Sequence, residues 1–192
     1  MAQTNFYAML FRMRYINRWG LMRNSDPENL SEHTLDVAYL THALCVIQNT
    51  RLGGNVDTGA AVLHAMYHDC CEIITGDMPT PIKYQSDGIR TAYKQVEQDA
   101  NNRLISLLPD DLARCYHPYL SDSDDPLIKA LVKGADKLSA LIKCMEEEKG
   151  GNREFVKAGE STLASLKAMQ LPAVDIFLEE CLPAYRLTLD EL

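Results

Sequence analysis

Helical periodicity runs through almost the whole 192-residue chain and restricts its fold more than any other feature. Apolar side chains recur three and four residues apart, prolines and glycines cluster between the periodic segments, and no stretch alternates as a strand would. The pattern predicts an all-α fold. The expected helices cover residues 4–14, 31–49, 58–75, 87–108, 126–150, 153–170 and 173–187, with Ser31, Asp57 and Asp125 as N-caps.

The chain length and the short linkers predict a single domain over residues 1–192. One domain usually has about 100–200 residues. A chain of this size buries roughly 70% of the surface that its unfolded form exposes. The 46% of hydrophobic residues can fill such a core.

The charge and the cysteines restrict the partners and the compartment. The net charge of −8 argues against a partner that is a long nucleic acid, although residues 1–25 carry four arginines and no acid and can serve a small phosphorylated ligand. No apolar run approaches the ~20 residues of a membrane span. The six cysteines are scattered without a Cys-x-x-Cys motif, which is typical of a reducing compartment. We therefore expect a protein of a reducing compartment.

The segment from His64 to Glu72 is the most informative in the sequence. On a helix that turns roughly 100° per residue, the side chains of His68, Asp69 and Glu72 would share one arc. An imidazole and two carboxylates would then face one space. The alternative is a helix whose histidine and acids are only solvated, because a His-Asp pair by itself is a weak signal.

Two further polar residues lie on or beside apolar stripes. His33 shares a stripe with Val37 and Leu44, where a polar group needs a partner, since leaving it unpaired costs about 1–3 kcal/mol. A hydrogen bond would supply that partner, and so would a metal shared with His68. Asp136 lies at the edge of a later stripe, where it can alternatively pair with a neighbouring lysine.

The order His, His-Asp and a late Asp resembles the HD-domain superfamily of metal-dependent phosphohydrolases. Longer motifs are similar to those of the bacterial 5'-deoxynucleotidases in this superfamily, and the similarity covers nearly the whole chain. These motifs are Ile16-Asn17-Arg18-Trp19, Asn29-Leu30-Ser31-Glu32-His33, Met66-Tyr67-His68-Asp69 with Glu72, and Thr75-Gly76-Asp77-Met78-Pro79-Thr80-Pro81.

The resemblance implies an HD-type helical bundle and a role for each matching residue. The implied metal ligands are His33, His68, Asp69 and Asp136. The implied catalytic residues are Glu72, Arg18 and Asp77. The implied substrate-binding residues are Arg18, Trp19, Asp69, Asp77, Met78, Pro79, Thr80 and Asp136. Met78 stands where leucine is usual, and Cys70 and Cys71 replace small residues on the expected helix, where they add a possible sensitivity to oxidation.

The residue types suit that chemistry. Two imidazoles and two carboxylates favour Mn, Co, Fe or Zn over Ca or Mg. Glu72 can orient a water molecule and accept its proton. Arg18 presents a planar fork to phosphate oxygens. Trp19 can pack on a sugar or a base, or can instead anchor the core.

The resemblance implies hydrolysis of deoxyribonucleoside 5'-monophosphates to a deoxynucleoside and phosphate by a cytoplasmic homodimer. The nearest alternative is an HD-domain phosphohydrolase for another nucleotide, such as a cyclic nucleotide, a deoxynucleoside triphosphate or a guanosine polyphosphate. A regulator that binds metal or nucleotide without catalysis is the other alternative. Glu72 argues against it, because binding alone does not need a general base.

Overall fold

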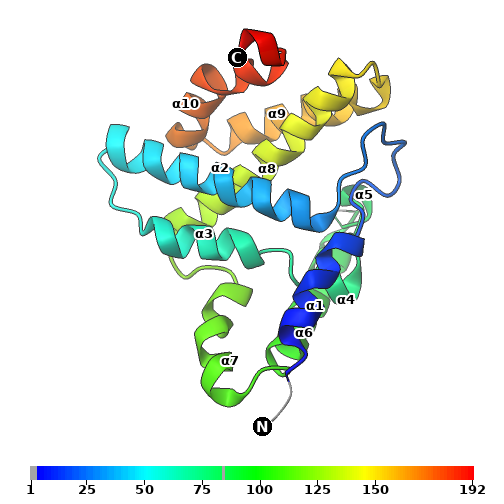
Figure 1. Cartoon of the computed structure of the whole chain (residues 1–192), viewed down its shortest axis with the longest axis vertical. Helices are drawn as coiled ribbons and strands as arrows, with labels where there is room; N and C mark the ends of the chain where they lie inside the picture. Colours follow the sequence, from blue (N-terminus) through cyan, green and yellow to red (C-terminus); the bar gives the residue numbers. More distant parts are fainter. Residues whose placement is uncertain (1–3, 84) are drawn as a thin grey trace. The chain divides into compact units, whose positions relative to one another are not determined.

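The computed structural model describes residues 4–83 and 85–192. The regular secondary structure in these ranges is helical, apart from an isolated antiparallel bridge between Asn17 and Asn29 (Figure 1). The predicted all-α fold is confirmed. The α-helices are α1 (Phe6–Leu10), α2 (Leu30–Arg51), α3 (Thr58–Tyr67), α4 (Glu72–Thr75), α5 (Thr80–Lys83), α6 (Asp87–Ile105), α7 (Asp110–Tyr116), α8 (Pro126–Lys149), α9 (Val156–Ala168) and α10 (Pro172–Glu180). The 3-10 helices are η1 (Phe11–Tyr15), η2 (His117–Leu120), η3 (Arg153–Phe155), η4 (Leu182–Arg186) and η5 (Leu189–Glu191).

The described residues form two compact units, and helix α2 contributes its first turn to one and the rest of its length to the other. The first unit comprises residues 4–23, 27–34, 67–83 and 85–123, and the second comprises residues 24–26, 35–66 and 124–192. None of the described helices is both long and apolar enough to cross a membrane.

The first unit packs α1, α4 and α5 against α6. Phe6 and Leu104 are fully buried at its centre, and Leu30 at the start of α2 joins the same cluster. The aromatic rings of Phe6 and Tyr116 meet edge to face, 5.0 Å apart. This small core fixes the segments that carry the polar residues of the candidate site.

The second unit is built on the long helix α8, which packs along α9 and also contacts α10 (Figure 1). Gly134 lets these helices approach closely, because a Cβ atom at this position would lie 2.9 Å from Cγ2 of Val174 on α10. The predicted stripe on α2 is buried here, with Val37 and Leu44 fully inaccessible. His42, nine residues beyond His33 on the same helix, is exposed.

Local side-chain chemistry sets the helix starts, and two of the three predicted N-caps are confirmed. Asp125 accepts hydrogen bonds from the N–H groups of Leu127 and Ile128, and Asp57 accepts one from Ala60. The prediction that Ser31 caps α2 is wrong. Asn29 accepts from the Ser31 and Glu32 N–H groups, and Glu32 accepts the Asn29 N–H in return, which is the reciprocal pattern of a capping box.

The predicted continuous helix over 58–75 is also wrong, because a turn separates α3 from α4. Within this turn the hydrogen bonds run over three residues, from the Cys70 N–H to the Tyr67 carbonyl and from the Glu72 N–H to the Asp69 carbonyl. Such bonds tighten the chain relative to an α-helix. His68 and Asp69 therefore lie in a turn, so the 100° projection does not describe how they face Glu72.

Cys70 and Cys71 lie in the same turn, and both side chains are buried. Burial raises the pKa of the Cys70 thiol to about 12 and raises that of Cys71 further. A buried thiol with a raised pKa forms little of the reactive thiolate. The structure therefore gives no support to the expectation that this pair adds sensitivity to oxidation.

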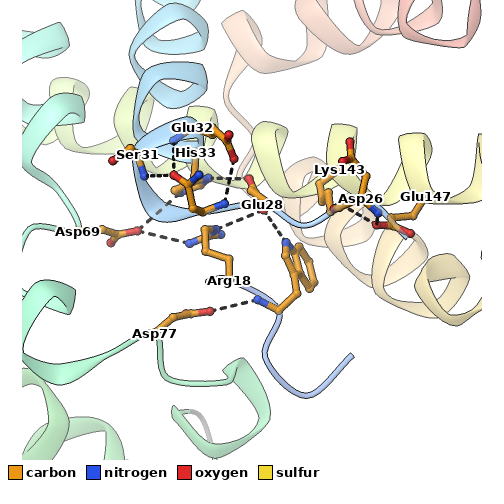
Figure 2. A network of polar contacts seen from close by, with 12 residues as sticks. Arg18, Asp26, Glu28, Ser31, Glu32, His33, Asp69, Asp77, Lys143 and Glu147 are labelled. Atoms are coloured by element: carbon orange, nitrogen blue, oxygen red, sulfur yellow. Dashed lines mark hydrogen bonds and ion pairs between the residues drawn. The ribbon is translucent and has the colours of Figure 1, made fainter. Parts of the chain in front are cut away.

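A buried ion pair fixes the segment 24–26 within the second unit. The Glu147 carboxylate, which is inaccessible, accepts hydrogen bonds from Lys143 Nζ at 2.6 Å, from Asn152 Nδ2 at 2.7 Å and from the backbone N–H groups of Ser25 and Asp26. Figure 2 shows Glu147 with Lys143 and Asp26. Burial raises the pKa of Glu147, but these donors outweigh it and lower the pKa to about 2. The charged form is therefore the one that the fold stabilises.

The Glu147 pair predicts a pH-dependent stability. Because the folded pKa of Glu147 is depressed, its contribution is present above about pH 4.5 and is lost as the pH falls towards 2. We expect Glu147→Gln to lower the free energy of unfolding by about 3 kcal/mol at pH 7, with the difference from wild type shrinking below pH 4.5. Urea titrations across pH measure this.

The exposed Glu160 on α9 gives the matched control. Glu160→Gln should change the free energy of unfolding by less than about 0.5 kcal/mol at every pH. A Glu147→Gln effect that stayed constant from pH 7 to pH 2 would contradict the role of the charged carboxylate.

Candidate functional site

In the first unit, three basic side chains converge on one oxygen of Asp69. Figure 2 shows the contacts from His33 and Arg18. Asp69 Oδ2 lies 3.1 Å from Nε2 of His68, 3.6 Å from Nε2 of His33 and 3.6 Å from Nη1 of Arg18. His33 is fully buried, and His68 is 15% exposed. The His33 and His68 imidazoles and the Asp69 carboxylate thus form one cluster, as the sequence predicts.

Three different elements supply these side chains. His33 lies in the first turn of α2, where its N–H donates to the Asn29 carbonyl. His68 and Asp69 follow α3 in the tight turn, and the two imidazole rings are 5.4 Å apart. Arg18 follows the Asn17–Asn29 bridge, and its backbone N–H donates to the Glu28 carbonyl. The bridge, the helix start and the turn together position the cluster.

Burial and neighbouring charges shift the pKa values of the acidic groups in and around this cluster. Burial raises the pKa of Asp69, but the His68 and His33 imidazoles outweigh it and hold the pKa well below its usual range. Burial, followed by the charges of Asp69 and Asp77, raises the pKa of Glu72 to about 9. Burial also raises the pKa of Asp77, against the opposing effect of Arg18. Asp69 is therefore held as a carboxylate, whereas burial and the neighbouring acids favour the protonated form of Glu72 in the absence of a cation.

The donor set fits a divalent transition metal. Two imidazole nitrogens and a carboxylate oxygen approach the same region, and mixed nitrogen and oxygen ligands suit Mn, Fe, Co or Zn. Glu72 follows Asp69 by three residues, and its side chain is buried. Its Oε2 has no hydrogen-bond partner among the described residues. A cation would favour the charged forms of these carboxylates.

Trp19 adopts an unusual backbone conformation beside this cluster. Its φ of +59° lies in the left-handed region, which costs a non-glycine residue on the order of 1–3 kcal/mol. Two carboxylates hold it in place: the backbone N–H donates to Asp77 Oδ2 at 3.2 Å, and the indole N–H donates to Glu28 Oε2 at 2.8 Å (Figure 2). Strain of this kind is typical of functional sites. It favours a binding role for Trp19 over that of a core anchor.

The predicted substrate loop lies after α4. Gly76, with a φ of +74°, ends that helix, and the loop continues through Asp77 and the half-buried Met78 and Pro79 to Thr80 at the start of α5. Asp77 joins the site through its bond to Trp19. Thr80 is exposed, and its place in substrate binding stays a prediction.

Glu28 is a member of the cluster that the sequence analysis missed. Its carboxylate contacts Arg18, Trp19 and His33. Burial raises the pKa of Glu28, but the neighbouring His33 and Arg18 lower it below its usual value. Residues 17–30 show no periodicity, so the sequence carries no pattern that marks this glutamate. Its proximity to the motif that begins at Asn29 is the one available signal.

Asp136, the fourth predicted metal ligand, lies half-buried on α8 in the second unit. Its neighbours Gly134 and Ala135 are buried in the core of that unit. The convergence on Asp69 belongs to the first unit alone, so the role of Asp136 as a ligand stays a prediction.

Two solved structures with this fold are described as HD-domain phosphohydrolases. One from Listeria innocua matches with a TM-score of 0.84 at 24% identity, over 94% of this chain and 88% of that chain. The cyanophage S-2L HD phosphohydrolase DatZ, solved with dA and one catalytic Zn²⁺ ion, matches with a TM-score of 0.64 at 18% identity, over 93% of this chain and 95% of that chain. At these identities the similarity establishes the fold, and the predicted HD-type bundle is confirmed.

Sequence comparison defines the family within that fold. The family model described as "5'-deoxynucleotidase YfbR-like" matches residues 5–185. The curated 5'-deoxynucleotidase YfbR of Escherichia coli O1:K1 / APEC is 44% identical over 195 residues, which cover 100% of this chain and 97% of that protein. The chain therefore belongs to the YfbR-like 5'-deoxynucleotidase family.

The cluster predicts which histidine on α2 holds a metal. We expect His33→Ala to lower the affinity for Zn²⁺ or Mn²⁺ by roughly tenfold or more, because it removes an imidazole that faces Asp69. His42→Ala, which removes an exposed imidazole from the same helix, should leave the affinity unchanged. Elemental analysis after dialysis measures the bound metal. Full occupancy in His33→Ala would refute the site.

Proposed function

We propose that this chain is a metal-dependent 5'-deoxynucleotidase, which hydrolyses deoxyribonucleoside 5'-monophosphates to a deoxynucleoside and phosphate. The observation that carries the proposal is the convergence of His33, His68 and Arg18 on Asp69. It occurs in a chain that is 44% identical over its full length to a 5'-deoxynucleotidase. The cluster offers metal ligands and a phosphate-binding cation within one unit.

Four residues would hold the metal in this proposal: His33, His68, Asp69 and, from the second unit, Asp136. When bound, a divalent transition metal supplies a Lewis acid for a phosphate oxygen. The donor set is consistent with Mn, Fe, Co or Zn. Asp136 is included on the strength of the motif order in the sequence, in which it is the late aspartate.

Arg18 is placed to bind the phosphate of the substrate. Its side chain is 12% exposed, and its Nη1 lies 3.6 Å from Oδ2 of Asp69 in the cluster. The planar fork suits phosphate oxygens and stabilises the charge that develops on them during hydrolysis. In this proposal Trp19 packs against the deoxyribose or the base, and Asp77 accepts a hydrogen bond from a sugar hydroxyl.

Glu72 acts as the general base in this proposal. Glu72 is buried beside other acids, which favours its protonated form, and a bound cation would restore its charged form. In that form the carboxylate can accept the proton of the attacking water. Its position at the start of α4, directly after the turn that holds Asp69, fixes its backbone beside the cluster.

We further propose that the chain works as a homodimer in the cytoplasm. The outer face of α2 presents an apolar stripe formed by Leu35, Tyr39 and Val46, which are 53%, 66% and 42% exposed. An exposed row of large apolar side chains is characteristic of a surface that another protein covers. The six cysteines are all free thiols, which is consistent with a reducing compartment.

A nucleotide panel tests the activity directly. We expect the metal-loaded protein to release inorganic phosphate from deoxyribonucleoside 5'-monophosphates under Mn²⁺, Co²⁺, Fe²⁺ or Zn²⁺, and to stop when a chelator is added. Ribonucleoside monophosphates, a cyclic nucleotide, a deoxynucleoside triphosphate and a guanosine polyphosphate complete the panel. Release of pyrophosphate or triphosphate in place of phosphate would support the alternative substrates. Binding of nucleotide without release of any product would support a regulator.

A second measurement separates the base from the ligands. Glu72→Gln keeps the size of this buried side chain but removes its ability to accept a proton. We expect kcat to fall by about 10²–10⁴-fold while metal content and KM remain close to those of wild type. Loss of metal from Glu72→Gln would instead make Glu72 a ligand and would contradict its role as base.

A further inference from the structure

Glu28 is fixed by the backbone beside the substrate-binding segment. Its carbonyl accepts the Arg18 N–H at 3.0 Å, and the next residue, Asn29, pairs with Asn17 in the isolated bridge. The Leu30 N–H also donates to the Ile16 carbonyl at 2.9 Å. These hydrogen bonds hold the segment at residues 16–18 beside the segment at residues 28–30. The Glu28 side chain is 11% exposed.

The carboxylate of Glu28 contacts three groups that have separate roles in the site (Figure 2). Oε2 accepts the indole N–H of Trp19 at 2.8 Å and lies 3.5 Å from Nε of Arg18. Oε1 lies 3.5 Å from Nδ1 of His33. One side chain therefore faces both proposed substrate-binding residues and one proposed metal ligand.

The contact with His33 determines which of its nitrogens is available. A carboxylate beside Nδ1 favours a proton on that nitrogen, which leaves Nε2 of a neutral imidazole with its lone pair. Nε2 is the atom that faces Asp69 Oδ2, at 3.6 Å. Glu28 therefore selects the form of His33 that can bind a metal on the side of the cluster.

The contact with Trp19 supports a strained residue. The backbone of Trp19 is left-handed, and its indole N–H and backbone N–H each donate to a carboxylate, of Glu28 and Asp77 respectively. The removal of Glu28 would take away the carboxylate that accepts the indole N–H and fixes the direction of the ring. The orientation of the ring thus depends on the residue that also orients His33.

We propose that Glu28 is a positioning residue that couples the metal ligand His33 to the substrate-binding pair Arg18 and Trp19. The identities of metal and substrate rest on the function proposed above. The coupling itself rests on the contacts of one carboxylate within the first unit. Glu28 touches neither reactant; it acts through the three side chains that it holds.

The experiment uses the full-length protein with three changes at Glu28 and one matched control. Glu28→Gln keeps the shape but replaces one acceptor oxygen by a donor, so it can serve either His33 or Trp19. Glu28→Asp keeps the charge on a shorter arm, and Glu28→Ala removes both contacts. Glu32→Gln is the control, because Glu32 lies four residues away and caps α2 through the Asn29 N–H.

Two readouts are independent of turnover. Zn²⁺ affinity is measured by competition with a chromophoric chelator. Trp19 is the sole tryptophan of the chain, so intrinsic fluorescence reports on this residue alone. KM for a deoxyribonucleoside monophosphate and the midpoint of thermal unfolding complete the set.

We expect Glu28→Gln and Glu28→Ala to weaken Zn²⁺ binding by about 10–100-fold, as changes to a partner of a ligating histidine do. Glu28→Ala should also raise KM and shift the Trp19 emission of the metal-free protein. Glu28→Gln should change KM and emission less, because its amide oxygen can still accept the indole N–H. In wild type, Zn²⁺ should change the Trp19 emission, and this response should disappear in Glu28→Ala. Glu28→Asp should be intermediate, and Glu32→Gln should match wild type in metal affinity and emission.

Zn²⁺ affinity within twofold of wild type in both Glu28→Gln and Glu28→Ala would overturn the proposal. A lowered unfolding midpoint combined with unchanged affinity would do the same, because it would assign Glu28 a structural role alone. If wild type released no phosphate from any deoxynucleotide, the proposed function would fail. The Zn²⁺ and fluorescence measurements would still decide the role of Glu28.

Discussion

The Asp69 carboxylate must be compensated where water has limited access, and much of the first unit follows from that requirement. An unpaired charge in such a place is costly, so charged groups inside proteins are paired or bind metals. Two imidazoles and a guanidinium meet this need at one oxygen. They come from the start of α2, from a turn after α3 and from a short bridge. These separate local structures are linked because they serve one charge.

Two buried glutamates show how the surroundings of a carboxylate decide whether it serves stability or reactivity. Glu147 is surrounded by donors, which lower its pKa and leave it charged and inert. Glu72 has an oxygen without a hydrogen-bond partner in the described structure, and burial beside other acids raises its pKa. Perturbed carboxylates of this second kind are characteristic of reactive sites. The sequence contains both as ordinary glutamates near helix ends, so burial and partners carry the distinction.

The sequence predicted those features that depend on neighbouring residues. The Asp125 and Pro126 start of α8 and the buried stripe of α2 follow from capping chemistry and periodicity. The interruption between α3 and α4 did not, because periodicity continues through a turn of three-residue hydrogen bonds. His68 and His33 were still grouped correctly, since the motif order carried that inference. The role of Glu28 was not predicted, because its contacts depend on a bridge between two segments that show no periodicity.

The left-handed backbone of Trp19 sets local stability against function. Glycine adopts that conformation without the steric cost that a tryptophan bears, so the backbone alone would favour glycine at position 19. The chain keeps tryptophan at a position where its loss would relieve backbone strain. Such a cost in stability is typical of residues that are needed for activity. A variant of this chain chosen only for resistance to heat would therefore be expected to lose Trp19 early. Its gain in stability would come from the segment that we propose binds the substrate.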